Sequence, residues 1–374
     1  MMTTDALGLY LHVPFCLKKC GYCDFFSTPC YTPDLLDAYV EALCKEIRAR
    51  AEKGREVDTV YFGGGTPTVL SETHFSQILE TLRSAFSIAS DGEITVEMNP
   101  ATADLAKLRH LRSLGVNRIS MGAQAMDDRH LRTLGRVHTA DQLLSSFAAA
   151  REAGFSNISV DLMYNIPGQT AEEFLSTVDR VLALEPAHVS AYSLILEEGT
   201  PFYSRYTSSD LLGQDEEYGM YRALCLRMAE AGFRHYEISN YAKAGQESRH
   251  NLRYWTLRPY LGFGPSAHSY DEGARTYRDA DLSAYIRDPL APPEVERGES
   301  ASEAAYEYAM LGLRTADGIS LSRYETLADR SLLEGKEGLL SRLTAEGQMM
   351  LAGDRLCLTE QGMYVSSAIL CALL

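Results

Sequence analysis

The stretch Cys16-Leu17-Lys18-Lys19-Cys20-Gly21-Tyr22-Cys23 places three thiols within eight residues, directly after a short apolar run from Leu9 to Val13. Iron–sulfur clusters are held by closely spaced cysteine thiolates. A cubane [4Fe–4S] cluster has one more iron than three cysteines can ligate, so one iron keeps an open coordination position. The amino and carboxylate groups of S-adenosylmethionine (SAM) fit that position. The spacing therefore predicts a SAM-ligated [4Fe–4S] cluster on Cys16, Cys20 and Cys23.

Other uses of these thiols are less well supported. A zinc site needs a fourth ligand, and although His12 is nearby, the spacing matches no common zinc knuckle. Disulfides require an oxidising compartment, to which nothing in the sequence points. Isolated buried cysteines behave as small hydrophobic residues. That role does not account well for three cysteines in one turn that also contains glycine and lysine. Zinc and chance remain the alternatives to the cluster.

Composition narrows the function classes. The chain has 374 residues, 45% hydrophobic and 23% charged, with a net charge of -16, which argues against a nucleic-acid partner. It has no apolar stretch long enough to span a membrane and no basic start with an apolar core of the signal-peptide kind. We expect a cytoplasmic protein; peripheral membrane association and a homodimer stay open.

Short β-rich runs alternate with amphipathic helical stretches from residue 8 to about 195, which predicts parallel βαβ units. Six strands are short of the eight that close a barrel. We therefore expect an open, partial (β/α)6 barrel, with a doubly wound sheet as the rival. The predicted strands are Gly8–Val13, Thr59–Phe62, Ile94–Met98, Arg118–Met121, Asn157–Leu162 and Val189–Leu194. The predicted helices are Asp34–Ala51, Ser71–Phe86, Thr102–Leu114, Thr139–Ala153 and Ala171–Leu184.

Polar or glycine-rich signals follow every one of these strands, at the end where both folds place functional residues. Glycines let a backbone approach a ligand and present N–H groups to it. Strand-end carboxylates can accept hydrogen bonds from ribose hydroxyls, although a helix cap or a solvated loop explains each one alone equally well. The signals are the cysteine loop, Gly63-Gly64-Gly65-Thr66-Pro67, Glu97-Met98-Asn99-Pro100, Gly122-Ala123-Gln124, Asp161-Leu162-Met163-Tyr164 and Leu196-Glu197-Glu198-Gly199.

The remainder of the chain divides into an extension, a linker and a C-terminal module. We expect the partial barrel over residues 1–200, an extension completing the core over 201–286, a proline-rich linker over 287–300 and a winged-helix-like α+β domain over 301–374. The extension carries two polar–aromatic stretches, one from Tyr236 to Tyr241 and one from His250 to Trp255. The module has a predicted hairpin at Met349–Leu358 and lacks the basic patch of a DNA-binding domain.

Together these motifs resemble the radical-SAM coproporphyrinogen-oxidase-like proteins and, within that group, the HemW-type haem chaperones. The resemblance runs from about residue 8 to the C-terminus. It rests on Tyr10–Cys16, the cysteine triplet with Asp24-Phe25, the GGGTP loop, Glu97–Pro100, Asp161–Tyr164 with Pro167–Thr170, and the H-N-x-x-Y-W motif at His250–Trp255. One departure is Asn165, where relatives often have glycine.

By matched motif, the resemblance implies a [4Fe–4S] cluster with SAM alongside it. The weaker assignments, at the pocket edge, are Ile195 and His268. The implied SAM contacts are Tyr10, Tyr22, Gly64, Gly65, Thr66, Glu97, Gln124, Arg136, Asp161, Ile195 and His268.

The resemblance also implies a haem chaperone that transfers haem to acceptor haemoproteins, those of the respiratory chain among the candidates. The related oxygen-independent coproporphyrinogen III oxidases carry a further cysteine where this chain has Phe25, have a longer segment before the cluster and lack the H-N-x-x-Y-W motif. We therefore expect no such oxidase activity. A radical SAM enzyme acting on a porphyrin is the alternative.

The H-N-x-x-Y-W motif is the candidate haem site. We expect His250 to be an axial ligand of the haem iron, since a neutral imidazole is a common one. Its neighbours Asn251, Tyr254 and Trp255 would complete the site, with the two aromatic rings covering a porphyrin face. The competing interpretation is a core histidine whose ring nitrogens are satisfied inside the protein.

Overall fold

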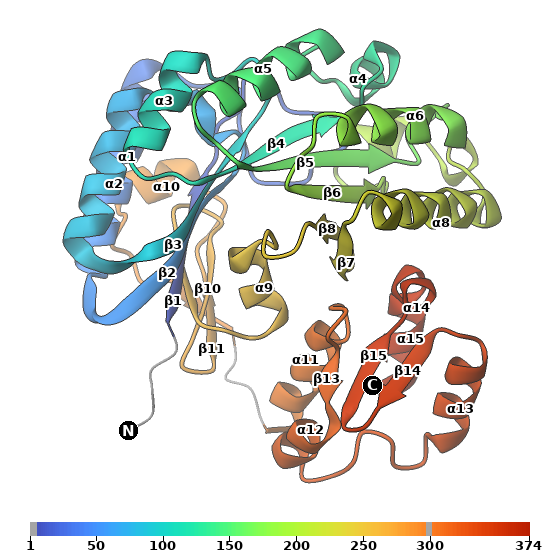
Figure 1. Cartoon of the computed structure of the whole chain (residues 1–374). Helices are drawn as coiled ribbons and strands as arrows, with labels where there is room; N and C mark the ends of the chain where they lie inside the picture. The colour runs from blue at the N-terminus through green and yellow to red at the C-terminus, as the bar shows by residue number, and fades with distance from the viewer. Residues whose placement is uncertain (1–5, 297–300) are drawn as a thin grey trace.

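The six predicted strands lie side by side in one parallel sheet, in the order in which they occur in the chain. The computed structural model describes residues 6–296 and 301–374 (Figure 1). Parallel neighbours bring the carboxyl ends of all six strands to the same edge. The strands are β1 (Leu7–Val13), β2 (Glu52–Gly64), β3 (Phe86–Met98), β4 (Arg118–Gln124), β5 (Asn157–Tyr164) and β6 (His188–Ser193).

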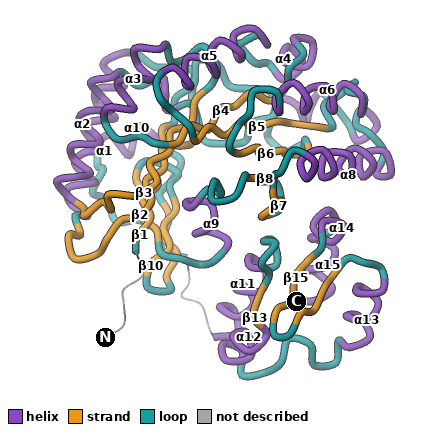
Figure 2. Tube along the Cα trace, in the orientation of Figure 1, coloured by secondary structure: helices purple, strands orange, loops and turns teal. Residues whose placement is uncertain are grey.

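Helices connect these strands and run along the outside of the curved sheet (Figures 1 and 2). Ser71, Thr139 and Thr170 each form a capping box with the residue three positions on, which fixes where three of the helices begin. Ser71 and Thr139 are also the residues at which two of the predicted helices begin. The helices are α1 (Pro33–Ala49), α2 (Glu72–Ala85), α3 (Leu105–Ser113), α4 (Asp128–Leu134), α5 (Ala140–Glu152) and α6 (Ala171–Leu182), with a 3-10 turn η1 (Pro67–Val69) after β2.

The extension adds strands at both edges of this sheet. β9 pairs in parallel with β1, and β8 pairs antiparallel with β6, giving a 12-stranded sheet in the order β12-β11-β10-β9-β1-β2-β3-β4-β5-β6-β8-β7. The added strands are β7 (Arg234–Glu237), β8 (Asn240–Ala242), β9 (Tyr260–Phe263), β10 (His268–Asp271), β11 (Ala274–Tyr277) and β12 (Glu294–Val295). The added helical segments are α7 (Pro201–Arg205), η2 (Ser208–Asp210), α8 (Gln214–Glu230), α9 (Arg249–Trp255) and α10 (Leu282–Arg287).

The C-terminal domain has its own apolar core, built around Leu313, Leu343 and Leu356. Its antiparallel sheet has the order β13-β15-β14, with helices before and after it, as expected of a winged-helix-like module. The predicted hairpin is present. The elements are α11 (Ala301–Gly312), β13 (Ile319–Ser320), α12 (Leu321–Ala328), α13 (Glu337–Ala345), β14 (Met349–Ala352), β15 (Arg355–Leu358), α14 (Glu360–Tyr364) and α15 (Ser366–Leu373).

The C-terminal domain contacts the extension through backbone hydrogen bonds and apolar packing. Ala316 donates its backbone N–H to the carbonyl of Tyr236 at 2.9 Å, and Thr315 forms an antiparallel bridge with Glu237. Ile238 packs on the C-terminal core. The C-terminal domain therefore supports the turn between β7 and β8.

Several elements differ from the sequence expectation. β2 and β3 begin seven or eight residues earlier than predicted, at Glu52 and Phe86, because their first halves carry polar residues and lack the apolar run. The predicted linker 287–300 contains the strand β12, and its residues 297–300 lie outside the described residues. Short helices such as α4, α7 and α9 were not predicted, since two turns carry too little periodicity. Among the described residues, no helix is long and apolar enough to cross a membrane.

Candidate SAM and cluster site

The cysteine loop is fastened on three sides between β1 and α1. Cys16 donates its backbone N–H to Thr28, and Gly21 donates to the carbonyl of Leu134 at 3.3 Å while accepting from Phe202 at 2.9 Å. A Cβ on Gly21 would lie 2.5 Å from the Phe202 ring, so only glycine fits this close approach. The loop is thereby held against α4 and α7.

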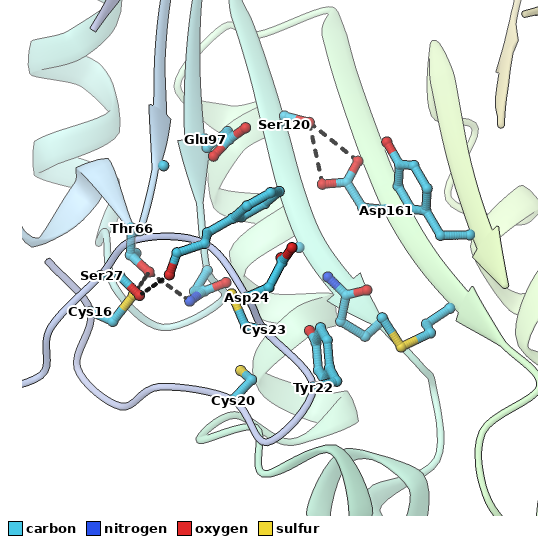
Figure 3. A pocket seen from close by; sticks show the side chains of 18 of the residues that line it. Cys16, Cys20, Tyr22, Cys23, Asp24, Ser27, Thr66, Glu97, Ser120 and Asp161 are labelled. Carbon is cyan, nitrogen blue, oxygen red and sulfur yellow. Dashed lines mark hydrogen bonds between the residues drawn. The ribbon is translucent and has the colours of Figure 1, made fainter. Parts of the chain in front are cut away.

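Donors from the loops after β2 and α4 lie beside two of the three thiols. The Thr66 hydroxyl lies 3.6 Å from the Cys16 Sγ, and an Arg136 guanidinium nitrogen lies 3.5 Å from the Cys20 Sγ. Asn99 holds both partners, because its amide nitrogen donates to Thr66 at 2.8 Å and its oxygen accepts from Arg136. Figure 3 shows the three cysteine side chains on one loop at the strand ends.

These residues fit a three-cysteine iron–sulfur cluster. The cysteines are unpaired, converge on one cavity and have a cation and a hydroxyl as sulfur donors, which are groups that tune such clusters. A Cβ on Gly65 would lie 2.5 Å from the Phe15 carbonyl oxygen and 3.0 Å from the Cys16 Sγ, so only glycine allows this close approach to the cysteine loop. The Nε of Arg136 is buried and has no hydrogen-bond partner among the described residues. When bound, a cluster would supply single-electron chemistry to SAM.

Two carboxylates from adjacent parts of the sheet face the same cavity. Glu97, at the end of β3, accepts a hydrogen bond from the Tyr61 hydroxyl at 2.7 Å, and burial raises its pKa to about 7. Asp161, on β5, accepts from the Ser120 hydroxyl at 3.2 Å (Figure 3), and burial raises its pKa as well. Both have acceptor oxygens to offer to ribose hydroxyls.

A cavity of about 730 Å³ joins these groups into one site. Most of the predicted site residues line it, coming from β1, the cysteine loop, the C-terminal parts of β2 to β5 and the loops after them, the loop after α4, and α9. They are Tyr10, Cys16, Cys20, Tyr22, Cys23, Gly64, Gly65, Thr66, Glu97, Gln124, Arg136, Asp161, Asn251, Tyr254 and Trp255. Asn165, the departure from the family pattern, has a φ of 59°, a left-handed conformation that asparagine tolerates well.

Three predicted site residues lie elsewhere. Ile195 is 65% exposed and His268 is exposed, with its ring stacked on Tyr277 at 5.6 Å; neither lines the cavity. His250 is 0% exposed, and its ring nitrogens lie 2.9 Å from the hydroxyls of Thr59 and Tyr254. The structure therefore does not support the prediction that His250 is an axial haem ligand, because neither nitrogen is free to reach an iron. The core-histidine interpretation describes it better.

One wall of the cavity consists of residues that were not predicted to belong to the site. Glu237 and Asn240, at the turn between β7 and β8, line it, and Asn240 pairs with Ser190 of β6. Glu237 is 0% exposed, and burial raises its pKa to about 7. The sequence feature that could have revealed these residues is an acidic residue and an asparagine inside the aromatic stretch Tyr236–Tyr241. Taken alone, that combination is typical of a turn. Tyr61 and Tyr192 also line the cavity and were missed as ordinary strand residues.

Comparison with known proteins places this site in a class. A model of the radical SAM superfamily matches residues 10–181, and a model of the HemN C-terminal domain matches residues 300–365. The radical SAM superfamily implies SAM and a [4Fe–4S] cluster, in agreement with the site described above.

Full-length relatives narrow the class to a family. A protein described as heme chaperone HemW from Bacillus subtilis is 38% identical, covering 98% of this chain and 98% of its own length. The heme chaperone HemW of Escherichia coli is 31% identical over 99% of this chain and 98% of its own. The chain belongs to the HemW family of the radical SAM superfamily.

Among solved structures, the radical SAM coproporphyrinogen III oxidase HemN from Escherichia coli is similar in fold, with a TM-score of 0.87 and 25% identity. The match covers 99% of this chain and 90% of that one. It confirms the expected fold: a radical SAM partial barrel with a small C-terminal α+β domain.

Proposed function

We propose that this protein is a haem chaperone that binds haem beside its SAM and cluster site and passes the haem to acceptor haemoproteins. The observation that carries the proposal is the full-length similarity to proteins described as heme chaperones. The cavity supports it, because the half-buried aromatic rings of Tyr254 and Trp255 line a space that also reaches the cysteine loop.

Within the cavity we assign SAM to the strand ends and haem to the side formed by α9. Glu97 and Asp161 would hold the ribose hydroxyls, and the cluster would rest on Cys16, Cys20 and Cys23. Haem would contact Trp255, Tyr254 and Asn251, with Phe25, 61% exposed on the cysteine loop, facing it. Burial of the porphyrin face would provide most of the affinity, at about 25 cal/mol per Å² of apolar area.

An anaerobic haem titration tests this assignment. Wild-type protein carrying its cluster should bind about one haem per chain, and Trp255→Leu should weaken haem binding about tenfold, the cost of losing an aromatic contact of about 1.4 kcal/mol. The matched control is Tyr203→Leu, an exposed aromatic outside the cavity. Equal haem affinity in the wild type and in Trp255→Leu would contradict the assignment to the α9 side.

The second candidate function is a radical SAM enzyme acting on a porphyrin, which the likeness to the HemN structure favours. Phe25 argues against it, since it occupies the position of the oxidases' additional cysteine. Anaerobic incubation with SAM, a reductant and coproporphyrinogen III should give no conversion to protoporphyrinogen IX. Sustained turnover would establish the enzyme in place of the chaperone.

The proposal names apo-haemoproteins as acceptors, with those of the respiratory chain as the first to test, and places the exchange in the cytoplasm. We also propose that the protein forms a homodimer and that it contacts membranes peripherally. Size-exclusion chromatography and vesicle co-sedimentation, each with and without haem, test these two proposals.

A further inference from the structure

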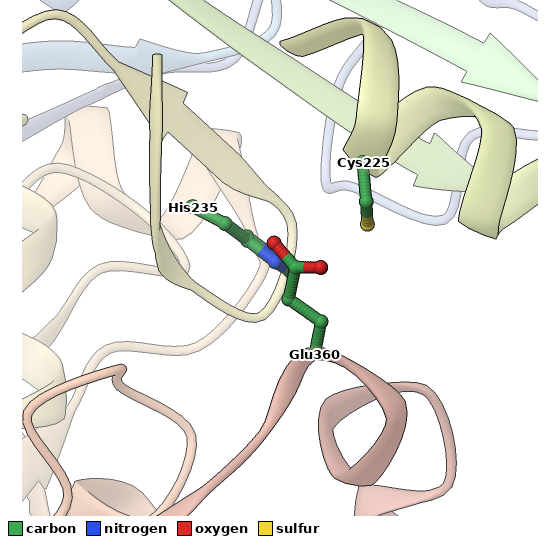
Figure 4. A group of neighbouring side chains, drawn as sticks. All are labelled: Cys225, His235 and Glu360. Carbon is green, nitrogen blue, oxygen red and sulfur yellow. The ribbon is translucent and has the colours of Figure 1, made fainter. Parts of the chain in front are cut away.

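Cys225, His235 and Glu360 meet where the C-terminal domain rests on the core (Figure 4), and none of them lines the SAM cavity. They come from α8, β7 and the first turn of α14, so the group spans the boundary between the two parts of the chain. One possible ligand atom of each lies within 4.8 Å of the others. In Figure 4 the three side chains converge on the same space.

His235 has a ring nitrogen with a free lone pair and a fixed ring orientation, as a metal ligand requires. One ring nitrogen, Nε2, lies 3.3 Å from the carbonyl oxygen of Ile238 and donates to it, which leaves the lone pair on Nδ1. Nδ1 is buried and has no hydrogen-bond partner among the described residues, and the whole residue is 8% exposed. Metal-binding histidines commonly donate their second nitrogen to a backbone carbonyl in this way. Stacking on Tyr241, at 4.3 Å between ring centres, fixes the ring.

The protonation state of His235 also suits a metal. Burial lowers the pKa of His235 to about 4, so its imidazole is neutral at pH 7, as a ligand must be. The Cys225 thiol is buried, lies 3.4 Å from the Tyr241 hydroxyl and has a pKa raised by burial. It would lose its proton to solvent when a metal binds, and no oxidant or reductant is required.

Glu360 brings the oxygen ligand from the other side. Its backbone carbonyl accepts a hydrogen bond from the Tyr221 hydroxyl at 2.8 Å, and the Thr359 side chain caps the helix on which it lies. Its carboxylate is exposed and can rotate toward the other two groups.

We propose that Cys225, His235 and Glu360 bind one zinc ion that joins the C-terminal domain to the core. A thiolate, an imidazole and a carboxylate are a borderline-soft donor set that suits zinc in tetrahedral geometry, with water in the fourth position on the exposed side. Ligands around zinc lie about 3.5 Å apart, so the three ligand atoms, which lie within 4.8 Å of one another, have to move closer by about 1 Å when the ion binds. Because β7 continues into Glu237, the ion would also steady the cavity wall.

The test compares zinc content among full-length variants purified anaerobically. The principal variant is Glu360→Gln, which removes a ligand from an exposed position and keeps the fold; Cys225→Ser is the second. The control is the triple variant of the cluster cysteines, Cys16→Ala, Cys20→Ala and Cys23→Ala, which removes the other cysteine motif able to hold zinc. Cys371→Ser controls for the loss of an unrelated exposed thiol.

We expect about one zinc per chain in the wild type, the triple variant and Cys371→Ser. Zinc affinity should fall at least 100-fold in Glu360→Gln and in Cys225→Ser, since even outer-shell changes cost about 10–100-fold. Adding zinc should raise the melting temperature of the wild type and not that of Glu360→Gln. The proposal is overturned if the wild type takes up no zinc, if both variants keep it, or if the triple variant loses it.

Discussion

Two glutamates, the half-buried Glu97 and the buried Glu237, face one cavity, and desolvation raises the pKa of each to about 7. A carboxyl group with a raised folded pKa favours the folded state at low pH. That contribution is fully present below the unfolded value of about 4.5 and is lost as the pH rises through 7. At the scale of single residues, the ionised forms of Glu97 and Glu237 therefore lower the stability of the ligand-free protein at neutral pH, while they supply acceptor oxygens for a ligand.

Glu237→Gln should remove its share of this cost. Relative to the wild type, its free energy of unfolding should increase between pH 5 and pH 8 by up to about 3 kcal/mol, because burial raises the pKa of Glu237 to about 7 in the folded protein. Denaturant unfolding of the apo protein across that pH range measures it. Glu198→Gln, on an exposed loop, is the control and should show no pH-dependent difference. A pH-independent difference for Glu237→Gln would show that its pKa is not raised.

For His250 we predict an effect on protein stability and no effect on the absorbance spectrum of bound haem. His250→Ala removes one hydrogen-bond partner from each of the Thr59 and Tyr254 hydroxyls, although Thr59 still accepts from Arg253, and should cost about 1–3 kcal/mol of folding free energy. The Soret position of bound haem should not change. Asn251→Ala, on the cavity beside it, is the matched variant, and its stability should stay close to that of the wild type. A shifted Soret band in His250→Ala would restore the iron-ligand interpretation.

At the scale of elements, the cysteine loop depends on its contact with α7. Gly21→Ala places a methyl group against the Phe202 ring, which must move or push the loop away from α4. We expect iron binding after anaerobic reconstitution to fall several-fold from the roughly four irons of one cubane, with the fold retained. Gly219→Ala, within α8 and with no atom near the added Cβ, is the control and should keep its iron. Full iron content in Gly21→Ala would show that the loop tolerates the shift.

The strand ends should bind SAM together, since β3 and β5 present Glu97 and Asp161 to one cavity. Glu97→Gln or Asp161→Asn should weaken SAM binding by about 1–3 kcal/mol each and leave the cluster absorbance unchanged. In the wild type, SAM affinity should rise with pH through about 7, because the ionised Glu97 is the better acceptor. Isothermal titration measures both effects. Unchanged affinity in both variants would make the carboxylates structural.

How far the sequence predicts this structure also differs between elements. The alternation of strands and helices predicts β1 to β6, and parallel pairing then brings their end signals to one edge, so the cluster and SAM side of the cavity can be inferred in advance. The pairing of β9 with β1 joins residues about 250 positions apart and leaves no local pattern. The direction of the His250 ring, inward from α9, was equally hidden, because a seven-residue helix can turn either face to the core.

At the scale of the whole molecule, the C-terminal domain forms the support of the cavity rather than a separate appendage. Thr315 and Ala316 pair with the backbone of β7, and Ile238 packs into the C-terminal core, so the wall containing Glu237 depends on both parts of the chain. The strand ends, the cysteine loop and α9 form the other sides. One cavity therefore joins the groups that suit a cluster, SAM and an aromatic ligand.

The central claim, that this cavity serves haem delivery, is tested most directly by the anaerobic transfer of haem from the cluster-loaded protein to an apo-haemoprotein. The appearance of the acceptor's own Soret spectrum reports the transfer. We predict complete transfer from the wild type, faster than the spontaneous loss of haem measured with a haem scavenger alone, and much reduced loading of Trp255→Leu. Transfer no faster than spontaneous loss, together with turnover of coproporphyrinogen III, would contradict the chaperone and establish a porphyrin-modifying enzyme.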